Sequence, residues 1–180
     1  MFSHFFFFSL SIDHMKWIAC EVDNETAIEG IAFHTMCPVF KGEPKLNTFY
    51  HPFEYLEKRK NNIPNVGLYI FGGKLKNNET LNTLSIIRFG SKPVKWQILE
   101  TEGDKPNPRY YHSMCHYPEL NILMIYGGKS NNPIKDEMYG EIFQDIWVLN
   151  LSNLNWIKAL TNKINEIGRC GHSTVLHGNK

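Results

Sequence analysis

Residues 109–128 read RYYHSMCHYPELNILMIYGG, in which two short apolar runs flank a Pro-Glu-Leu-Asn turn and a glycine pair closes the second run. Short runs rich in aromatic and β-branched residues, bounded by turn residues, are typical of β-strands. The stretch therefore predicts an antiparallel hairpin of residues 112–117 and 122–126. Two further apolar runs follow, at 144–150 and 155–160, and complete a unit of four strands.

The markers of this unit recur along the chain in the same order. An arginine stands three residues before a histidine, a glycine pair follows an apolar run, and a tryptophan comes near the end of the unit. The glycine pairs are 55 residues apart (127 − 72) and the histidines 60 apart (172 − 112). An ordered set repeated at this period indicates a repeat architecture in which each unit packs on its neighbours. The positions to which we assign structural roles are Gly72, Gly73, Trp96, Arg109, His112, Gly127, Gly128, Trp147, Trp156, Arg169 and His172.

The preceding unit follows the same plan, with strands expected at 31–36, 68–71, 84–89 and 95–99. Each glycine pair ends a second strand, where glycine alone tolerates a positive φ or a close backbone approach. The tryptophans are expected to bury their large side chains between neighbouring sheets.

These residues resemble the kelch motif, and the chain resembles part of a kelch β-propeller, an all-β fold of four-stranded antiparallel blades. The Asn- and Lys-rich units are most similar to the kelch families of ciliates and other protists. The resemblance implies two complete blades and parts of two more. The expected divisions are the end of a blade at 5–26, a blade at 27–100 with an insertion at 37–65, a blade at 101–160, and the start of another at 161–180.

The first unit departs from the kelch pattern in two ways. Ile31 stands where the unit's arginine is expected, and the insertion 37–65 separates its first two strands. Residues 53–60 within this insertion could form a short helix, which we interpret as a solvated turn rather than a docking motif. Propellers have four to eight blades, so we expect the chain to be a segment of a longer propeller, with closure by a partner chain as the alternative.

The sequence carries no enzyme signature, and we assign no catalytic, cofactor-binding or metal-binding residue. The histidines occupy one repeated position, which favours a scaffold role over catalysis. Cys115 and His116 are adjacent in a strand and point to opposite faces, so they are poorly placed to share a metal. Glu141 and Asp145 are similar to the start of an iron-binding signature of kelch specifier proteins, but Leu149 replaces its histidine.

Composition and charge point to a cytoplasmic protein without nucleic-acid or membrane partners. Nineteen Lys and Arg against 18 Asp and Glu leave a formal net charge of +1, which marks no nucleic-acid surface. The four cysteines are scattered and contain no CxxC pair, which suits reduced thiols. The apolar opening lacks a basic n-region and therefore does not read as a signal peptide.

Alternating strand direction places two kinds of loop on one face of the expected propeller. They are the loops between second and third strands, and those that join one unit to the next. Long loops on a rigid scaffold are where binding is expected, and in kelch proteins this is the usual partner-binding face.

The sequence predicts a non-enzymatic interaction module that acts as an adaptor or scaffold. The alternative is an accessory propeller of a longer enzyme or adaptor, such as a phosphatase, a kinase or a ubiquitin-ligase substrate receptor. The predicted partner-binding loops are 74–81, 101–108, 129–143 and 161–168.

Overall fold

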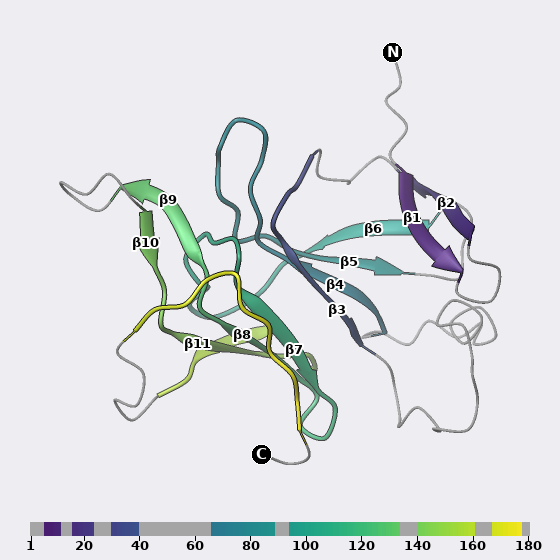
Figure 1. Cartoon of the computed structure of the whole chain (residues 1–180). Helices are drawn as coiled ribbons and strands as arrows, with labels where there is room; N and C mark the ends of the chain where they lie inside the picture. The colour runs from purple at the N-terminus through teal and green to yellow at the C-terminus, as the bar shows by residue number, and fades with distance from the viewer. Residues whose placement is uncertain are drawn as a thin grey trace.

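The computed structural model describes residues 6–11, 16–23, 30–39, 66–88, 94–133, 140–160 and 167–177. Within these ranges all regular structure is β-strand, arranged in three sheets (Figure 1). This agrees with the predicted all-β class. Among the same residues there is no helix long and apolar enough to cross a bilayer.

The first blade contains four strands in consecutive antiparallel order, as the repeat predicts. The first strand begins later than expected, because Phe33 has a positive φ of 58° and breaks the extended backbone before it. The same strand extends through Cys37 and Pro38, which the sequence assigned to the insertion 37–65. Residues 40–65, including the possible helix at 53–60, lie outside the described part of the chain. The strands are β3 (Thr35–Val39), β4 (Gly67–Phe71), β5 (Leu84–Arg88) and β6 (Val94–Leu99).

The second blade repeats this arrangement in a separate four-stranded antiparallel sheet. Its second strand has the predicted bounds, and the other three differ from prediction by one or two residues at their ends. The strands are β7 (Ser113–Tyr117), β8 (Ile122–Tyr126), β11 (Ile146–Asn150) and β12 (Asn155–Lys158).

The loop between β8 and β11 contains a two-stranded ribbon that the sequence did not predict. Here β9 (Lys129–Pro133) pairs with β10 (Gly140–Ile142) in antiparallel fashion, with a shift of register. Figure 1 shows the ribbon projecting beyond the blade. Its sequence, KSNNP, is rich in residues that disfavour strands, so local propensity pointed to a loop.

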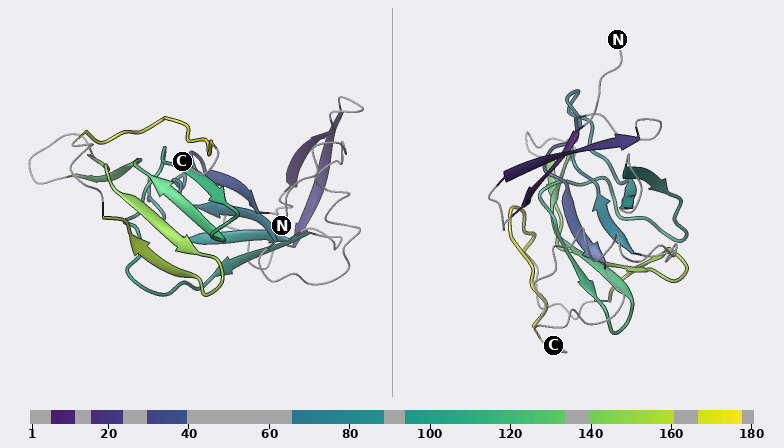
Figure 2. Two further views of the ribbon diagram at one scale, coloured as in Figure 1. Left: turned by 90° about the horizontal axis from the view of Figure 1, so that it is seen from below. Right: turned by 90° about the vertical axis from the view of Figure 1, so that its right-hand side faces the viewer.

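The N-terminal hairpin consists of β1 (Phe6–Ser11) and β2 (Lys16–Asp23), paired antiparallel. It lies on the far side of the first blade from the second (Figure 2). Two residues of β2 pair in parallel with the outer strand β6, through Val22 to Val94 and Asp23 to Lys95. The assignment of residues 5–26 to a separate blade stays a prediction.

The main apolar core lies between the two blades. Phe71 and Ile86 of the first blade pack in one cluster with Leu123 and Leu149 of the second, and all four are fully buried. Trp156 joins this cluster, and its ring centroid lies 5.3 Å from that of Phe71. Because each such side chain contributes about 1.5–3 kcal/mol when buried, this cluster fixes the two sheets against each other.

A second cluster lies on the other face of the first sheet. It contains Ile70, Ile87 and Val94, with Trp96 packed against it. Residues 167–177 are extended but form no regular strand, and they run beside β7 (Figure 1). They therefore occupy the place where the first strand of a following blade is expected.

Candidate functional site

The glycine pairs form the junctions between successive blades. Gly72 has a φ of +62°, and a Cβ there would lie 2.5 Å from the carbonyl oxygen of Arg109 in the next blade. The N–H of Gly73 donates to the same carbonyl at 2.9 Å. Gly127 and Gly128 repeat these contacts with Arg169, at 2.4 Å for the added Cβ and 2.7 Å for the hydrogen bond. A side chain at the first glycine would therefore push the next blade away.

The repeated histidines link the inner strands of neighbouring blades. Thr35 Oγ1 lies 2.5 Å from His112 Nε2, and Ser113 Oγ lies 2.8 Å from His172 Nε2 one blade further on. Burial, with smaller effects from the nearby Arg109, His34 and His172, lowers the pKa of His112 to about 3. His112 is thus a neutral, buried contact between blades at physiological pH.

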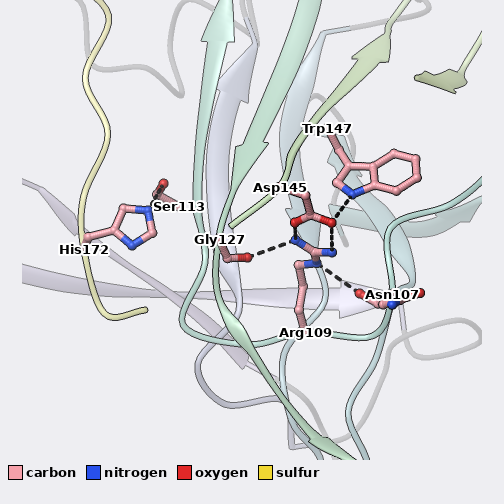
Figure 3. A network of polar contacts seen from close by, with 7 residues as sticks. All are labelled: Asn107, Arg109, Ser113, Gly127, Asp145, Trp147 and His172. Carbon is pink, nitrogen blue, oxygen red and sulfur yellow. Dashed lines mark hydrogen bonds and ion pairs between the residues drawn. The ribbon is translucent and has the colours of Figure 1, made fainter. Parts of the chain in front are cut away.

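Arg109 is completely buried at the start of the second blade. Figure 3 shows its guanidinium among its polar partners. Its guanidinium donates to both carboxylate oxygens of Asp145, at 2.6 and 3.1 Å, and to the carbonyl of Gly127 at 3.0 Å. It also lies over the ring of Phe143, 4.1 Å from the centroid. Trp147 Nε1 donates to Asp145 at 2.7 Å. Arg109, Gly127 and Trp147 therefore belong to one hydrogen-bond network, in which Asp145 connects Arg109 to Trp147.

This network accounts for Asp145 in structural terms. Burial acts to raise the pKa of Asp145, but the hydrogen bonds and charge of Arg109 outweigh it and hold the pKa below its usual range. Both oxygens of the carboxylate are taken by donors from Arg109 and Trp147. Across the described ranges no group of three or more potential metal-ligating side chains is present.

The first blade lacks both members of this ion pair. Gly72 N–H donates to the carbonyl of Thr83 as Gly127 N–H donates to that of Asp145, so Thr83 and Asp145 are equivalent positions. Ile31 replaces the arginine and Thr83 the aspartate. The sequence reasoning noted the missing arginine but did not identify Asp145 as its partner. The pairing could have been suspected from the sequence, because the arginine and the aspartate are both missing from the same unit.

Two of the predicted partner-binding loops lie together on one face. The loop 74–81 and the ribbon β9–β10 within 129–143 project from the same side of the blades (Figure 1). Tyr110 OH donates to Asn131 Oδ1 at 2.6 Å, and Asn131 Nδ2 donates to the carbonyl of Asn78 at 2.7 Å. These bonds connect the loops of successive blades into one surface.

The other two predicted loops are placed less uniformly. The N–H of Glu102 donates to Leu154 and its carbonyl accepts from Trp156, so the first part of 101–108 lies along the outer strand β12. The later part reaches the first blade, where Asn82 Nδ2 donates to the carbonyl of Pro106 at 3.3 Å. Of the loop 161–168 only the last two residues are described.

An aromatic cluster of Phe33, Tyr110 and Tyr111 lies beside the connected loops. The ring centroid of Phe33 is 4.5 Å from that of Tyr111, and the two tyrosine centroids are 5.1 Å apart. The sequence reasoning did not select these residues. The signal was an aromatic residue directly before the repeated histidine, at Phe33 and Tyr111.

Comparison with known proteins agrees with this architecture. The family model for the Kelch-repeats domain of KLHDC2, KLHL20 and DRC7 matches residues 62–180. The chain belongs to the Kelch-repeat family. Kelch-repeat domains are in general non-enzymatic and bind protein partners, and the matched relatives support an interaction module of this kind.

Several curated Kelch proteins are similar to parts of the chain. Dynein regulatory complex subunit 7 of Chlamydomonas reinhardtii is 33% identical over 95 residues, covering 52% of this chain and 7% of that protein. Human Host cell factor 1 is 33% identical over 126 residues, covering 62% of this Kelch chain and 6% of that protein. The chain thus spans less than a tenth of the length of these relatives.

A solved structure shows the same fold with little sequence identity. A chain in the cryo-electron-microscopy structure of RAG with one melted and one unmelted RSS superposes with a TM-score of 0.63 at 14% identity. The match covers 92% of this Kelch chain and 46% of that chain. At this identity the likeness concerns the fold alone.

Proposed function

We propose that this Kelch chain is a non-enzymatic adaptor or scaffold that binds a protein partner through its blade loops, namely 74–81, 101–108, 129–143 and 161–168. The observation that carries the proposal is the hydrogen-bonded link from Tyr110 through Asn131 to Asn78, which joins the loops of successive blades into one surface. Loops held on a rigid scaffold are suited to recognition because little conformational entropy is lost on binding.

The compartment and partner class follow from the same proposal. The net charge of +1 favours a protein partner over nucleic acid. Cys37, Cys115 and Cys170 are free thiols, which suits the reducing cytoplasm. Fractionation of cells expressing the protein tests this part, with recovery in the cytosolic fraction expected and recovery in a membrane or nuclear fraction against it.

An accessory propeller in a longer enzyme or adaptor is the second candidate. It is favoured by the length of the relatives. The region that matches this chain is only 7% of Dynein regulatory complex subunit 7 and 6% of Host cell factor 1. The appended part would be a phosphatase, a kinase or a ubiquitin-ligase substrate receptor domain. The coding sequence on either side of this region distinguishes the two candidates, because further Kelch units alone favour the adaptor.

Site-specific photo-crosslinking tests the proposed loop face. A photoreactive side chain is placed at Lys76 or at Glu141, both exposed on the loops, and at Leu120 in the turn between β7 and β8 as a control. In cells expressing these variants, we expect the same protein adducts from the two loop positions and none from Leu120. Equal adduct patterns at all three positions would contradict the assignment of the partner to this face.

A further inference from the structure

Two lysine side chains converge on the aromatic cluster of the loop face. Lys74 Nζ lies 5.5 Å from the ring centroid of Tyr110, and Lys129 Nζ lies 5.2 Å from the same centroid. Lys129 Nζ is also 5.4 Å from the centroid of Tyr111. The two lysines come from the loops of successive blades, so the junction itself brings them together.

Within the described residues, no carboxylate lies at ion-pair distance from the ammonium groups of Lys74 and Lys129. The ion pair present in this part of the chain joins Arg109 to Asp145. Lys74 and Lys129 are both half-buried. Charges that are partly removed from water interact more strongly with a partner and are screened less by salt than fully exposed ones. The cluster therefore presents two cations that lack an internal counter-charge in this part of the chain.

The aromatic side chains are held there at a conformational cost. Phe33 and Tyr111 occupy equivalent positions in the two blades and have positive φ values of 58° and 56°. Such a φ is rare for bulky residues and energetically costly, so the surrounding structure must enforce it, as it does at many ligand-binding sites. Phe33 is also 48% exposed despite its contacts with Tyr110 and Tyr111. At the third equivalent position stands Gly171, which has no side chain to present.

We propose that the surface formed by Phe33, Tyr110, Tyr111, Lys74 and Lys129 binds an acidic segment of the partner protein, one that carries two or more Asp or Glu carboxylates. This inference rests on the proposed function and specifies the chemistry of the partner. Carboxylates of the segment pair with the two ammonium groups, and its aliphatic and backbone atoms cover the exposed ring of Phe33. A nucleic acid also carries anions, but two lysines in a chain of net charge +1 favour a short acidic peptide over a polyphosphate.

Binding of a defined peptide to the immobilised full chain tests the inference. The probe is a short capped peptide of alternating Glu and Ala, and its neutral counterpart has Gln in place of Glu. We expect binding of the Glu peptide at low ionic strength, a decrease with added salt, and no binding of the Gln peptide. The double variant K74Q/K129Q should bind the Glu peptide about tenfold more weakly.

A matched control separates the cluster from a general loss of charge. The variant K95Q/K158Q removes the same net charge from two exposed lysines on the outer strands β6 and β12, outside the proposed partner-binding loops, and it should bind like the wild type. Circular dichroism verifies that both variants remain folded. Equal weakening by the two double variants, binding of the Gln peptide, or tighter binding of single-stranded oligonucleotide than of the Glu peptide would overturn the inference.

The crosslinking experiment distinguishes this inference from the function on which it rests. If loop crosslinks to a protein partner persist in K74Q/K129Q, the loop face binds a partner by other means and the acidic-segment inference is wrong. If no loop position yields a protein adduct while the Glu peptide still binds, the proposed adaptor function is wrong and the peptide site remains.

Discussion

At the scale of single residues, the ion pair of Arg109 and Asp145 carries a large desolvation cost. Arg109 is fully buried, and its guanidinium donates to the carbonyls of Asn107 and Gly127 as well as to the carboxylate. Desolvation of two charges is expensive, and a buried pair is tolerated only when such hydrogen bonds satisfy it. Removal of one partner therefore costs more than the pair contributes.

The variant R109A should lower the free energy of unfolding by about 3–5 kcal/mol, because it leaves Asp145, whose side chain is only 13% exposed, without its counter-charge. The exposed Arg169 at the equivalent position is the control, and R169A should change stability by less than about 0.5 kcal/mol. The double variant R109I/D145T, which copies Ile31 and Thr83 of the first blade, should recover part of the loss. Urea denaturation measures all three, and equal effects of R109A and R169A would contradict the account.

The buried histidine gives a pH dependence whose sign follows from its pKa. The pKa of His112 is about 3 in the folded chain and 6.5 in the unfolded chain. Between these two pH values the His112 imidazole is therefore protonated only when the chain is unfolded. Its contribution to stability is complete above pH 6.5 and is lost as the pH falls, at a rate of up to about 1.4 kcal/mol per pH unit. Asp145 has a lowered pKa and loses its contribution only at more acidic pH.

We therefore expect the urea midpoint to decrease between pH 7 and pH 5, and to decrease less in H112Q. The pKa values of His34 and His172 are lowered in the same direction, chiefly by burial, so some slope should remain in the variant. A wild-type midpoint that is constant over this range, or one that rises on acidification, would show that His112 is not a neutral buried contact.

At the scale of elements, the glycine pairs determine how closely successive blades approach. Gly127 combines a φ of +62° with a neighbouring carbonyl that a Cβ would meet at 2.4 Å. Gly171 has a φ of +71° but nothing within 4 Å of an added Cβ. These two glycines separate the cost of the backbone conformation from the cost of the blade contact.

The variant G171A should destabilise the chain by about 1–2 kcal/mol, the cost of placing a Cβ at a left-handed backbone conformation. The variant G127A should cost at least about 2 kcal/mol more, because the carbonyl of Arg169 must also move. Thermal melts of the two variants, compared with wild type, provide the measurement. Similar losses for both would show that the junction tolerates a side chain.

At the scale of the whole molecule, the outer face of the second blade is only partly covered. Ile157 is 56% exposed and Val175 is 85% exposed. Ile157 follows Trp156 in β12, and because Trp156 points into the core between the blades, Ile157 faces the side on which a further blade would pack. Val175 lies in the segment 167–177 that follows the second blade. Exposed apolar sheet surface favours association with other chains.

We expect the 180-residue polypeptide to self-associate at low micromolar concentration. The variant I157K/V175K should reduce the association, whereas I142K, which changes an exposed apolar residue on the ribbon β10, should not. Light scattering over a concentration series measures the effect. A wild-type chain that stays monomeric throughout would mean that these residues are not a packing surface.

Local sequence patterns were enough to predict the repeat, the all-β class and the position of most strands. Those features follow from local patterns, because alternation of apolar residues, turn chemistry and glycine pairs act within a few residues of one another. The late start of β3 and the ribbon β9–β10 escaped prediction, since the positive φ of Phe33 and the pairing of KSNNP depend on contacts beyond their own segments.

The contacts between distant residues, in contrast, became visible in the packing of the two blades. Arg109 and Asp145 are 36 positions apart, and the lysines at 74 and 129 belong to different blades. Their contacts depend on the angle and distance at which one sheet packs on the next, which no local pattern encodes. The repeat could therefore be read from the sequence, whereas the buried ion pair and the cationic aromatic surface exist only because the two blades are packed together.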